Sequence, residues 1–251
     1  MAPGTTAGAG HYRKGGTMLS ERYRPKEWND FVGQPVIDEI KAACTDPWLF
    51  GECGERWLFE SDGIAGCGKT SAAYVAARTL GCSDFSIERI DSRSVTIADF
   101  RELEGRMRQY GWAGNGRRCF IVDEIQHLNR DCMRMLLGLL ESLPSHVIVI
   151  GTTTSTNWAD DVDGLYSRWR RFRFRKPDAK AIAGLLERIA TEHKLPIPDG
   201  FRFLSYVQGK CSVELKGNNV RDCIDQLPDA LRRFKGKPAS MESTEADALA
   251  A

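Results

Sequence analysis

The chain has 251 residues, of which 42% are hydrophobic, and its 35 basic and 34 acidic residues leave a formal net charge of only +1. That length allows one large domain or two small ones with a substantial core. The balanced charge excludes a whole-molecule field as the means of binding nucleic acid, so any such binding has to be local. No apolar run approaches the roughly 20 residues that span a bilayer, and the first residues lack the apolar segment of a secretory signal. We therefore expect a cytoplasmic protein without a membrane partner.

The cysteines and histidines show no metal-binding pattern. The eight cysteines form no CxxC pair, and the four histidines are scattered. Zinc sites are typically marked by such paired spacing. We therefore expect no zinc site, and reduced thiols as in a cytosolic compartment.

Apolar and amphipathic segments alternate along the first two thirds of the chain. We expect strands at 56–61, 85–91, 118–124 and 146–153, and helices at 70–80, 96–110 and 130–143. This alternation predicts a parallel sheet covered by helices on both faces, the α/β class. After Pro177 the pattern is helical, beginning with 178–194. We predict an α/β domain at 19–176, a small helical domain at 177–235, and disordered tails at 1–18 and 236–251.

A glycine-rich segment lies between the first strand and the first helix of this pattern. The stretch "GIAGCGKT" fits G-x-x-x-x-G-K-[ST] completely. Its glycines allow backbone amides to turn inward around phosphates, and the following helix directs its positive end at the same place. Lys69 supplies a charge to the β- and γ-phosphates, and the Thr70 hydroxyl suits Mg²⁺. We predict an ATP and Mg²⁺ site built from Gly63, Ile64, Ala65, Gly66, Cys67, Gly68, Lys69, Thr70 and Ser71.

An acidic pair ends the third predicted strand. Asp123 and Glu124 follow an apolar run about 54 residues after Lys69. Asp123 is the expected metal partner, and Glu124 is the expected base that polarises an attacking water. The alternative is an ordinary pair of acids at the end of a strand.

Four further stretches resemble the small subunits of replication factor C, the clamp loaders among the AAA+ ATPases. The stretch "ERYRPKEWNDFVGQ" at 21–34 resembles their N-terminal signature. Residues 120–141 resemble the second acidic motif with its helix, 165–174 the Ser-Arg-Cys motif, and 217–227 the Gly-x-x-Arg segment of the helical lid. The stretches stand in the family's order over residues 19–234. The resemblance implies a P-loop AAA+ module with a parallel sheet, followed by a small helical lid.

The resemblance also implies roles for single residues. Thr153 would be the first sensor of the γ-phosphate, with Thr152 as the alternative, because the segment before Ser167 is longer than is usual in the family. Arg168 would be the arginine finger that acts on a neighbouring subunit, and Arg221 the second sensor of its own subunit. A guanidinium at the γ-phosphoryl group stabilises the charge of the transition state. For both arginines the alternative is a solvated surface position. The adenine pocket would be walled by Tyr23, Arg24, Pro25, Val32 and Gly33.

The chain departs from the family at two places. Trp169 stands where the family motif ends in Cys. Only 30 residues follow Arg221, fewer than the family's collar domain needs. We therefore expect an assembly that lacks this C-terminal collar, or one in which another chain supplies it.

Basic residues on two predicted helices are the candidates for DNA contact. Arg101, Arg106 and Arg108 precede the third strand, and Arg130 and Arg134 follow the acidic pair. Residues four or seven apart share a helix face, and such contacts to phosphates would be salt-dependent. The alternative is a solvated helix face.

The most basic stretch, "SRWRRFRFRK" at 167–176, is better explained as a strand. Phe172 and Phe174 alternate with arginines, so we expect the rings to face the core and the arginines to face outward. Charges on such a strand also discourage pairing at a sheet edge. DNA contact by this stretch is the less favoured interpretation.

We therefore predict an ATP-hydrolysing AAA+ subunit of a clamp-loader-like complex. It would assemble with other AAA+ subunits and open or load a sliding clamp at primed or duplex DNA, at the nucleoid or, in a eukaryote, in the nucleus. One alternative is a collarless AAA+ ATPase of DNA repair or recombination, or a viral relative of the clamp loaders. Another alternative is a nucleotide-bound scaffold that does not hydrolyse ATP.

Overall fold

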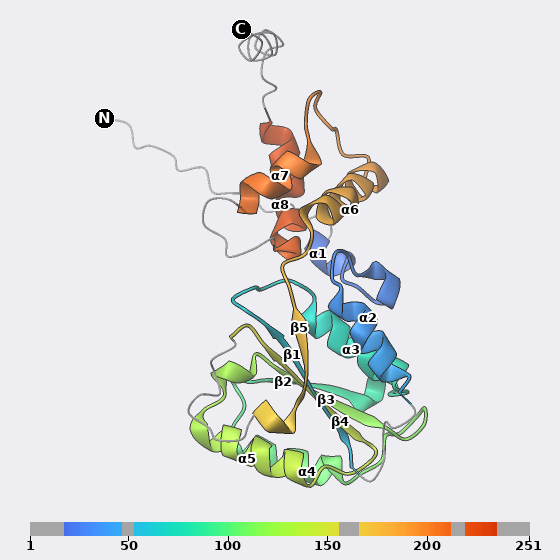
Figure 1. The fold of residues 1–251 in the computed structure, drawn as a ribbon, viewed down its shortest axis with the longest axis vertical. Helices are drawn as coiled ribbons and strands as arrows, with labels where there is room; N and C mark the ends of the chain where they lie inside the picture. Colours follow the sequence, from blue (N-terminus) through green and yellow to red (C-terminus); the bar gives the residue numbers. More distant parts are fainter. Residues whose placement is uncertain (1–17, 47–52, 156–165, 212–218, 235–251) are drawn as a thin grey trace, which may run out of the picture.

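The computed structural model describes residues 18–46, 53–155, 166–211 and 219–234 of the chain. The predicted tails lie outside these ranges, apart from Met18. The described residues form an α/β domain and a smaller helical domain above it, joined directly by the end of the last strand (Figure 1). Among the described residues, no helix combines the length and apolarity that crossing a bilayer requires.

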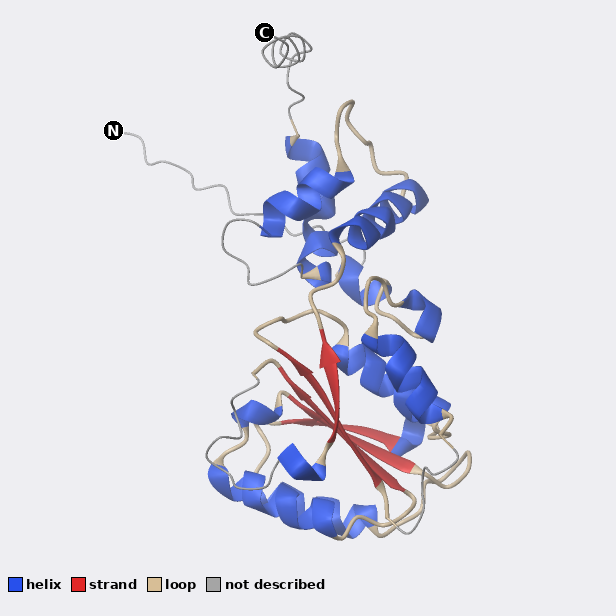
Figure 2. Cartoon of the chain, viewed as in Figure 1, coloured by secondary structure: helices blue, strands red, loops and turns tan. Residues whose placement is uncertain are grey.

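Five parallel strands form the sheet of the α/β domain (Figure 2). They are β1 (Glu55–Ser61), β2 (Ile87–Asp91), β3 (Arg118–Asp123), β4 (Val147–Thr153) and β5 (Arg170–Phe174). The strand order is β2-β3-β4-β1-β5. The three central strands are almost continuously buried, as expected of a parallel sheet covered on both faces. The predicted α/β fold is therefore confirmed.

Two pairs of helices cover the two faces of the sheet. They are α2 (Val36–Cys44) and α3 (Lys69–Thr79) on one face, and α4 (Ile97–Met107) and α5 (Arg130–Glu141) on the other. The predicted helices correspond to α3, α4 and α5, although α4 ends three residues earlier than expected, and α2 is a helix that the sequence pattern did not predict. Thr96 caps α4, because its hydroxyl accepts a hydrogen bond from the Asp99 amide at 3.3 Å. Four short 3₁₀ helices are η1 (Trp28–Asp30), η2 (Asp84–Ser86), η3 (Ile125–His127) and η4 (Tyr166–Arg168).

The edge strand β5 has the two faces that its alternation predicts. Phe172 and Phe174 are buried against the α2 and α3 side, whereas Arg171 and Arg173 are exposed. Arg171 also forms an ion pair of 2.9 Å with Glu60 of β1, whose side chain is 3% exposed. At least one arginine of this basic stretch therefore stabilises the sheet.

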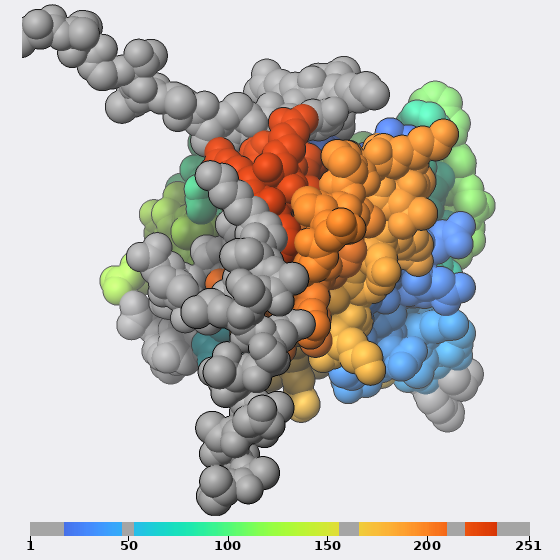
Figure 3. All heavy atoms as spheres, turned by 90° about the horizontal axis from the view of Figure 1, so that it is seen from above, coloured from blue at the N-terminus to red at the C-terminus, as the bar shows by residue number. Residues whose placement is uncertain are grey.

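Three helices and a short N-terminal helix build the second domain. They are α6 (Ala179–Glu192), α7 (Phe203–Cys211), α8 (Val220–Arg233) and α1 (Leu19–Arg22). Ile182, Leu186, Val207 and Leu227 are fully buried between them. Figure 3 shows this domain in orange and red in front, with the blue N-terminal segment beside it.

The helix α1 makes its contacts with the helical domain, although our sequence prediction grouped residue 19 onward with the sheet. The Ser20 amide and hydroxyl donate hydrogen bonds of 2.8 and 2.7 Å to the Asp225 carboxylate of α8. Further along the same segment, the Gln34 side chain donates a hydrogen bond of 2.7 Å to the Arg175 carbonyl at the end of β5. The N-terminal segment is thereby fastened to both domains.

Candidate functional site

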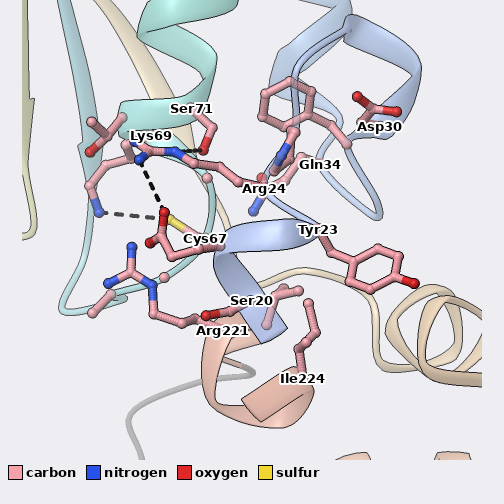
Figure 4. Close-up of a pocket in the computed structure, with 18 of the residues that line it drawn as sticks. Ser20, Tyr23, Arg24, Asp30, Gln34, Cys67, Lys69, Ser71, Arg221 and Ile224 are labelled. Atoms are coloured by element: carbon pink, nitrogen blue, oxygen red, sulfur yellow. Dashed lines mark hydrogen bonds and ion pairs between the residues drawn. The ribbon is translucent and has the colours of Figure 1, made fainter. Parts of the chain in front are cut away.

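A cavity of about 590 Å³ opens at the carboxyl end of the sheet, under the helical domain. In open parallel sheets, ligands bind at this edge. The walls come from the phosphate loop (residues 63–70), the N-terminal segment, the ends of β2 and β3, and the start of α8 (Figure 4). Of the site residues predicted from the sequence, those that line the cavity are Tyr23, Arg24, Pro25, Val32, Ala65, Gly66, Cys67, Gly68, Lys69, Thr70, Ser71, Asp123, Glu124 and Arg221.

The phosphate loop has the backbone conformation that its glycines permit. Gly63, Gly66 and Gly68 have φ values of 66°, 65° and 100°, which side chains with a Cβ rarely adopt. Gly68 is also the residue before α3, so the loop leads directly into the helix N-terminus. Gly63 and Ile64 support the loop from outside the cavity lining. The loop is therefore shaped to direct amides at an anion.

The amine of Lys69 is held beneath this loop. Lys69 is 5% exposed, and its Nζ donates hydrogen bonds of 2.9 Å to the Ser61 hydroxyl and to the Ile64 carbonyl. These two acceptors are neutral, so the ammonium keeps an unbalanced positive charge at the loop. That charge suits a phosphate.

Thr70 and Asp123 meet at the place predicted for a metal. The Thr70 hydroxyl donates a hydrogen bond of 2.8 Å to Asp123 Oδ1. Burial would raise the pKa of the Asp123 carboxyl, but hydrogen bonds from Thr152, Thr70 and Arg89 lower it below its ordinary value. An ionised carboxylate beside a hydroxyl is the hard oxygen donor set that Mg²⁺ takes, so these residues fit the ion.

Arg89 is a site residue that our sequence prediction missed. Its Nε and Nη2 lie 3.1 and 2.5 Å from Asp123 Oδ2, and it lines the cavity. The signal was present in the pattern, because Arg89 stands two residues before the end of β2, the parallel neighbour of β3. The alternation of strands and helices does not show which strands are neighbours in the sheet, so this signal did not identify Arg89.

Glu124 is held at the mouth of the site by its own neighbours. Its φ of 55° is left-handed, a conformation that costs a residue with a side chain about 1 kcal/mol or more. The Glu124 amide donates a hydrogen bond of 3.0 Å to the Thr152 hydroxyl. Its carboxylate accepts hydrogen bonds from Gln126 and, at 3.0 Å, from the Thr154 hydroxyl. These contacts fix the orientation of the carboxylate.

Thr152, not Thr153, contacts the acidic pair. Thr152 donates 2.6 Å to Asp123 Oδ1, whereas the Thr153 hydroxyl bonds to the carbonyl and amide of Ser155 at 3.0 and 3.1 Å. The two residues face opposite sides of β4. The structure therefore brings the alternative sensor residue into the site, and the sensor role of either residue stays a prediction.

Of the five residues predicted to wall the adenine pocket, four line the cavity and Gly33 does not. Arg24 turns toward the phosphate loop, where its Nε donates 3.2 Å to the Ser71 hydroxyl. The Tyr23 ring points toward α6 (Figure 4) and packs edge-on against His193, with ring centroids 5.7 Å apart. Gly33 lies outside the lining, and a Cβ there would lie 2.7 Å from the Asp178 amide. Its backbone conformation thus serves the junction between the domains.

The two predicted functional arginines lie in different places. Arg221 enters the cavity from the first turn of α8. Arg168 lies outside the cavity lining, and its guanidinium pairs with Glu141 at the end of α5. A position away from the nucleotide of its own subunit is required of a residue that acts on a neighbour. Trp169 beside it is buried in the core under α4 and α5.

The basic residues predicted to contact DNA lie on the neighbouring helices α4 and α5 (Figure 1), with Arg108 directly after the end of α4. Arg101, Arg108, Arg130 and Arg134 are all exposed. Arg108 pairs with Glu104 at 2.7 Å and Arg134 with Asp131 at 3.4 Å. Arg106 differs, because it reaches Glu88 of β2 at 2.8 Å and is partly buried. DNA contact by the four exposed residues stays a prediction.

Comparison with known proteins agrees with this geometry. Residues 62–177 match the model of the ATPase family associated with various cellular activities (AAA). The subunit gamma of DNA polymerase III from Buchnera aphidicola is 26% identical over 241 residues, which cover 87% of this chain and 61% of the relative. The gamma/tau subunit from Mycobacterium tuberculosis is 27% identical, with 85% of this chain and 38% of the relative covered.

A third relative and a solved structure extend the comparison. ATPase WRNIP1 from Dictyostelium discoideum is 28% identical over 93% of this chain and 26% of its own length. The chain thus spans less than two thirds of each of these three relatives. The structure of the Thermotoga maritima RuvB Holliday junction branch migration motor aligns with a TM-score of 0.56 at 18% identity, covering 83% of this chain and 73% of that one. Fold and phosphate loop agree with the family model, which matches residues 62–177 as an AAA ATPase domain.

Proposed function

We propose that this protein is an ATP-hydrolysing AAA+ subunit of a clamp-loader-type complex, which opens or loads a sliding clamp at primed DNA. The observation that carries the ATPase proposal is the convergence of Lys69, Thr70 and Asp123 around one cavity at the carboxyl edge of the sheet. The proposal for the clamp rests on the relatives that are named as DNA polymerase III gamma subunits.

The residues of the cavity have distinct tasks in this reaction. The loop amides and Lys69 bind the β- and γ-phosphates, and Thr70 with Asp123 would hold Mg²⁺. The ion, when bound, offsets the negative charge of the phosphates. Glu124 orients the attacking water and accepts its proton. Arg221 approaches the phosphates from the helical domain of the same subunit, and Arg168 approaches those of a neighbouring subunit.

An exposed aromatic surface supports a protein partner. Phe85, Tyr110 and Trp112 are 93%, 72% and 96% exposed. Phe85 belongs to η2, and Tyr110 and Trp112 belong to the segment after α4. The two segments adjoin, because a Cβ on Gly111 would lie 2.8 Å from the Ser86 hydroxyl. Both segments precede strands, so this aromatic surface lies at the amino edge of the sheet, opposite the nucleotide cavity. Large exposed apolar side chains are typical of interaction sites, and a sliding clamp is the partner we assign to them.

The remaining partners follow from the same proposal. Other AAA+ subunits, either copies of this chain or relatives, would receive Arg168. DNA phosphates would contact Arg101, Arg108, Arg130 and Arg134 on α4 and α5, with affinity that falls as salt rises. Such work places the protein with replicating DNA.

The test is the ATPase rate of the chain, together with any subunits that co-purify, with and without primed DNA and a sliding clamp at several salt concentrations. We expect stimulation that needs both DNA and clamp. A rate that is indifferent to both contradicts clamp loading. The second candidate is an AAA ATPase that acts on DNA without a clamp, and the likeness to WRNIP1 favours it. Native mass spectrometry with an ATP analogue distinguishes the two candidates. An open five-membered assembly favours the clamp loader, and a closed ring or filament favours the second candidate.

A further inference from the structure

We propose that Arg89 is a displaceable cation at the Asp123 carboxylate, which engages this group through two guanidinium nitrogens and competes there with the divalent metal. The inference rests on the proposed function, because it concerns how the same site takes Mg²⁺. It assigns a positioning role to a side chain that the phosphate-loop and acidic motifs do not include.

The Asp123 carboxylate is fully engaged in the structure. Oδ1 accepts hydrogen bonds from Thr70 at 2.8 Å and Thr152 at 2.6 Å. Oδ2 accepts from Arg89 Nε at 3.1 Å and Nη2 at 2.5 Å. A carboxylate offers about four lone-pair positions, and these four contacts use them. A metal that takes Asp123 directly or through its waters must therefore displace a donor.

Arg89 is the donor that can leave most easily. The Arg89 side chain is 51% exposed, whereas that of Asp123 is 10% exposed. Thr152 is fully buried on β4, and Thr70 is itself the other predicted metal ligand. An exposed guanidinium regains water when it leaves an ion pair, so the separation is inexpensive. A buried carboxylate left without any cation would be unfavourable, so exchange of one cation for another is favoured over simple loss.

The cavity also gives the displaced guanidinium a destination. Arg89 lines the same space as Lys69 and Thr70, so it stays beside the position predicted for the phosphates. Two cations at one carboxylate repel each other at short range. Removing the charge of Arg89 should therefore make the metal bind more tightly.

The test compares Arg89→Gln with Arg93→Gln, a matched control from the same cavity. Arg93 lines the cavity, but its guanidinium lies 3.1 Å from His127 Nε2. Both substitutions remove one positive charge, and only the first removes the Asp123 contact that the structure shows. Binding of Mn²⁺ is measured by electron paramagnetic resonance with a non-hydrolysable ATP analogue, and anisotropy of a fluorescent analogue is measured against Mg²⁺ concentration.

We expect Arg89→Gln to lower the half-saturating metal concentration about three- to tenfold, a range that allows for the exposure of the ion pair. Arg93→Gln should change it less than about twofold, since the Arg93 guanidinium contacts His127 and its exposed charge is screened by salt. In EDTA, Arg89→Gln should also lower the melting temperature, and saturating metal with nucleotide should restore it. If the Gln variant does not fold without metal, Arg89→Lys, which keeps the charge but not the contact of two nitrogens with Oδ2, should give an intermediate metal affinity.

Two results overturn the inference. An unchanged or raised metal requirement for Arg89→Gln, with wild-type protein that binds Mn²⁺ and nucleotide normally, shows that Arg89 does not compete with the metal. In that case the proposed function survives. If wild-type protein binds no metal–nucleotide complex at all, the proposed function fails, and the role of Arg89 fails with it.

Discussion

The Thr152 hydroxyl links the two halves of the acidic pair. It donates a hydrogen bond of 2.6 Å to the Asp123 carboxylate and accepts one of 3.0 Å from the Glu124 amide. One buried side chain on β4 thereby sets the position of the predicted metal ligand at the end of β3 and of the predicted base that follows it. The effects of changing Thr152 should therefore appear in both metal use and hydrolysis.

We predict that Thr152→Val will lower both stability and turnover. A buried carboxylate loses a hydrogen bond, which costs about 1 kcal/mol or more, and the Glu124 amide loses its acceptor. Thr153→Val is the matched control, because the Thr153 hydroxyl bonds with Ser155, whereas the Thr152 hydroxyl bonds with the acidic pair. Melting temperature and steady-state ATPase rate measure the two effects. A larger loss of turnover in Thr153→Val would favour Thr153 as the sensor.

Substitution of Glu124 by Gln should abolish hydrolysis while nucleotide binding persists. Removing a general base typically costs about 100-fold or more in rate, and the amide keeps the shape of the side chain. Glu104→Gln, an acidic side chain on α4 outside the cavity, should hydrolyse ATP at the wild-type rate. Hydrolysis unchanged in Glu124→Gln would favour another base, and no hydrolysis in any form of the protein would favour the scaffold.

Arg168→Ala should lose about 10³-fold or more in rate, the range known for arginine fingers. Because the finger acts on a neighbour, mixing Arg168→Ala with Glu124→Gln should restore part of the activity. In the mixed assembly, the Gln variant supplies an intact finger to the intact site of the Ala variant. Glu141→Gln, which removes the carboxylate paired with Arg168, should stay active. Absence of rescue at every mixing ratio would place the role of Arg168 within its own subunit.

The Asp123 carboxylate should make stability depend on acid pH. Its pKa in the folded protein lies below the ordinary value of 3.8, so its stabilising contribution is present above that value and is lost as pH falls through the folded pKa. Urea unfolding of wild type and Asp123→Asn should therefore differ most near neutral pH, and the difference should shrink on acidification. A difference that grows as pH falls would mean that the folded pKa is raised.

The aromatic surface should matter for clamp-dependent activity only. Trp112→Ser and Phe85→Ser should leave the basal ATPase rate unchanged and reduce the stimulation by a clamp. Ile197→Ser, which changes an exposed apolar residue of the helical domain, is the matched control and should keep full stimulation. Equal stimulation by the clamp in all three variants would show that the clamp does not bind this aromatic surface.

Local pattern predicted much of the fold, because strand and helix periods depend on neighbours in the chain. The strands β1, β3 and β4 begin and end within one residue of their predicted bounds. The phosphate loop was found for the same reason, since one continuous segment makes it. The Arg89–Asp123 pair and the Ser20–Asp225 contact join segments that are distant in sequence. Such pairs depend on strand order and domain docking, which no single segment encodes.

The most direct test of clamp loading is retention of a sliding clamp on circular primed DNA, separated from free clamp by gel filtration. The chain with its co-purifying subunits is compared in the presence of ATP, in its absence, and with Glu124→Gln. The proposed function predicts retention that needs ATP and primed DNA. Retention that is the same without the protein or without ATP would contradict it.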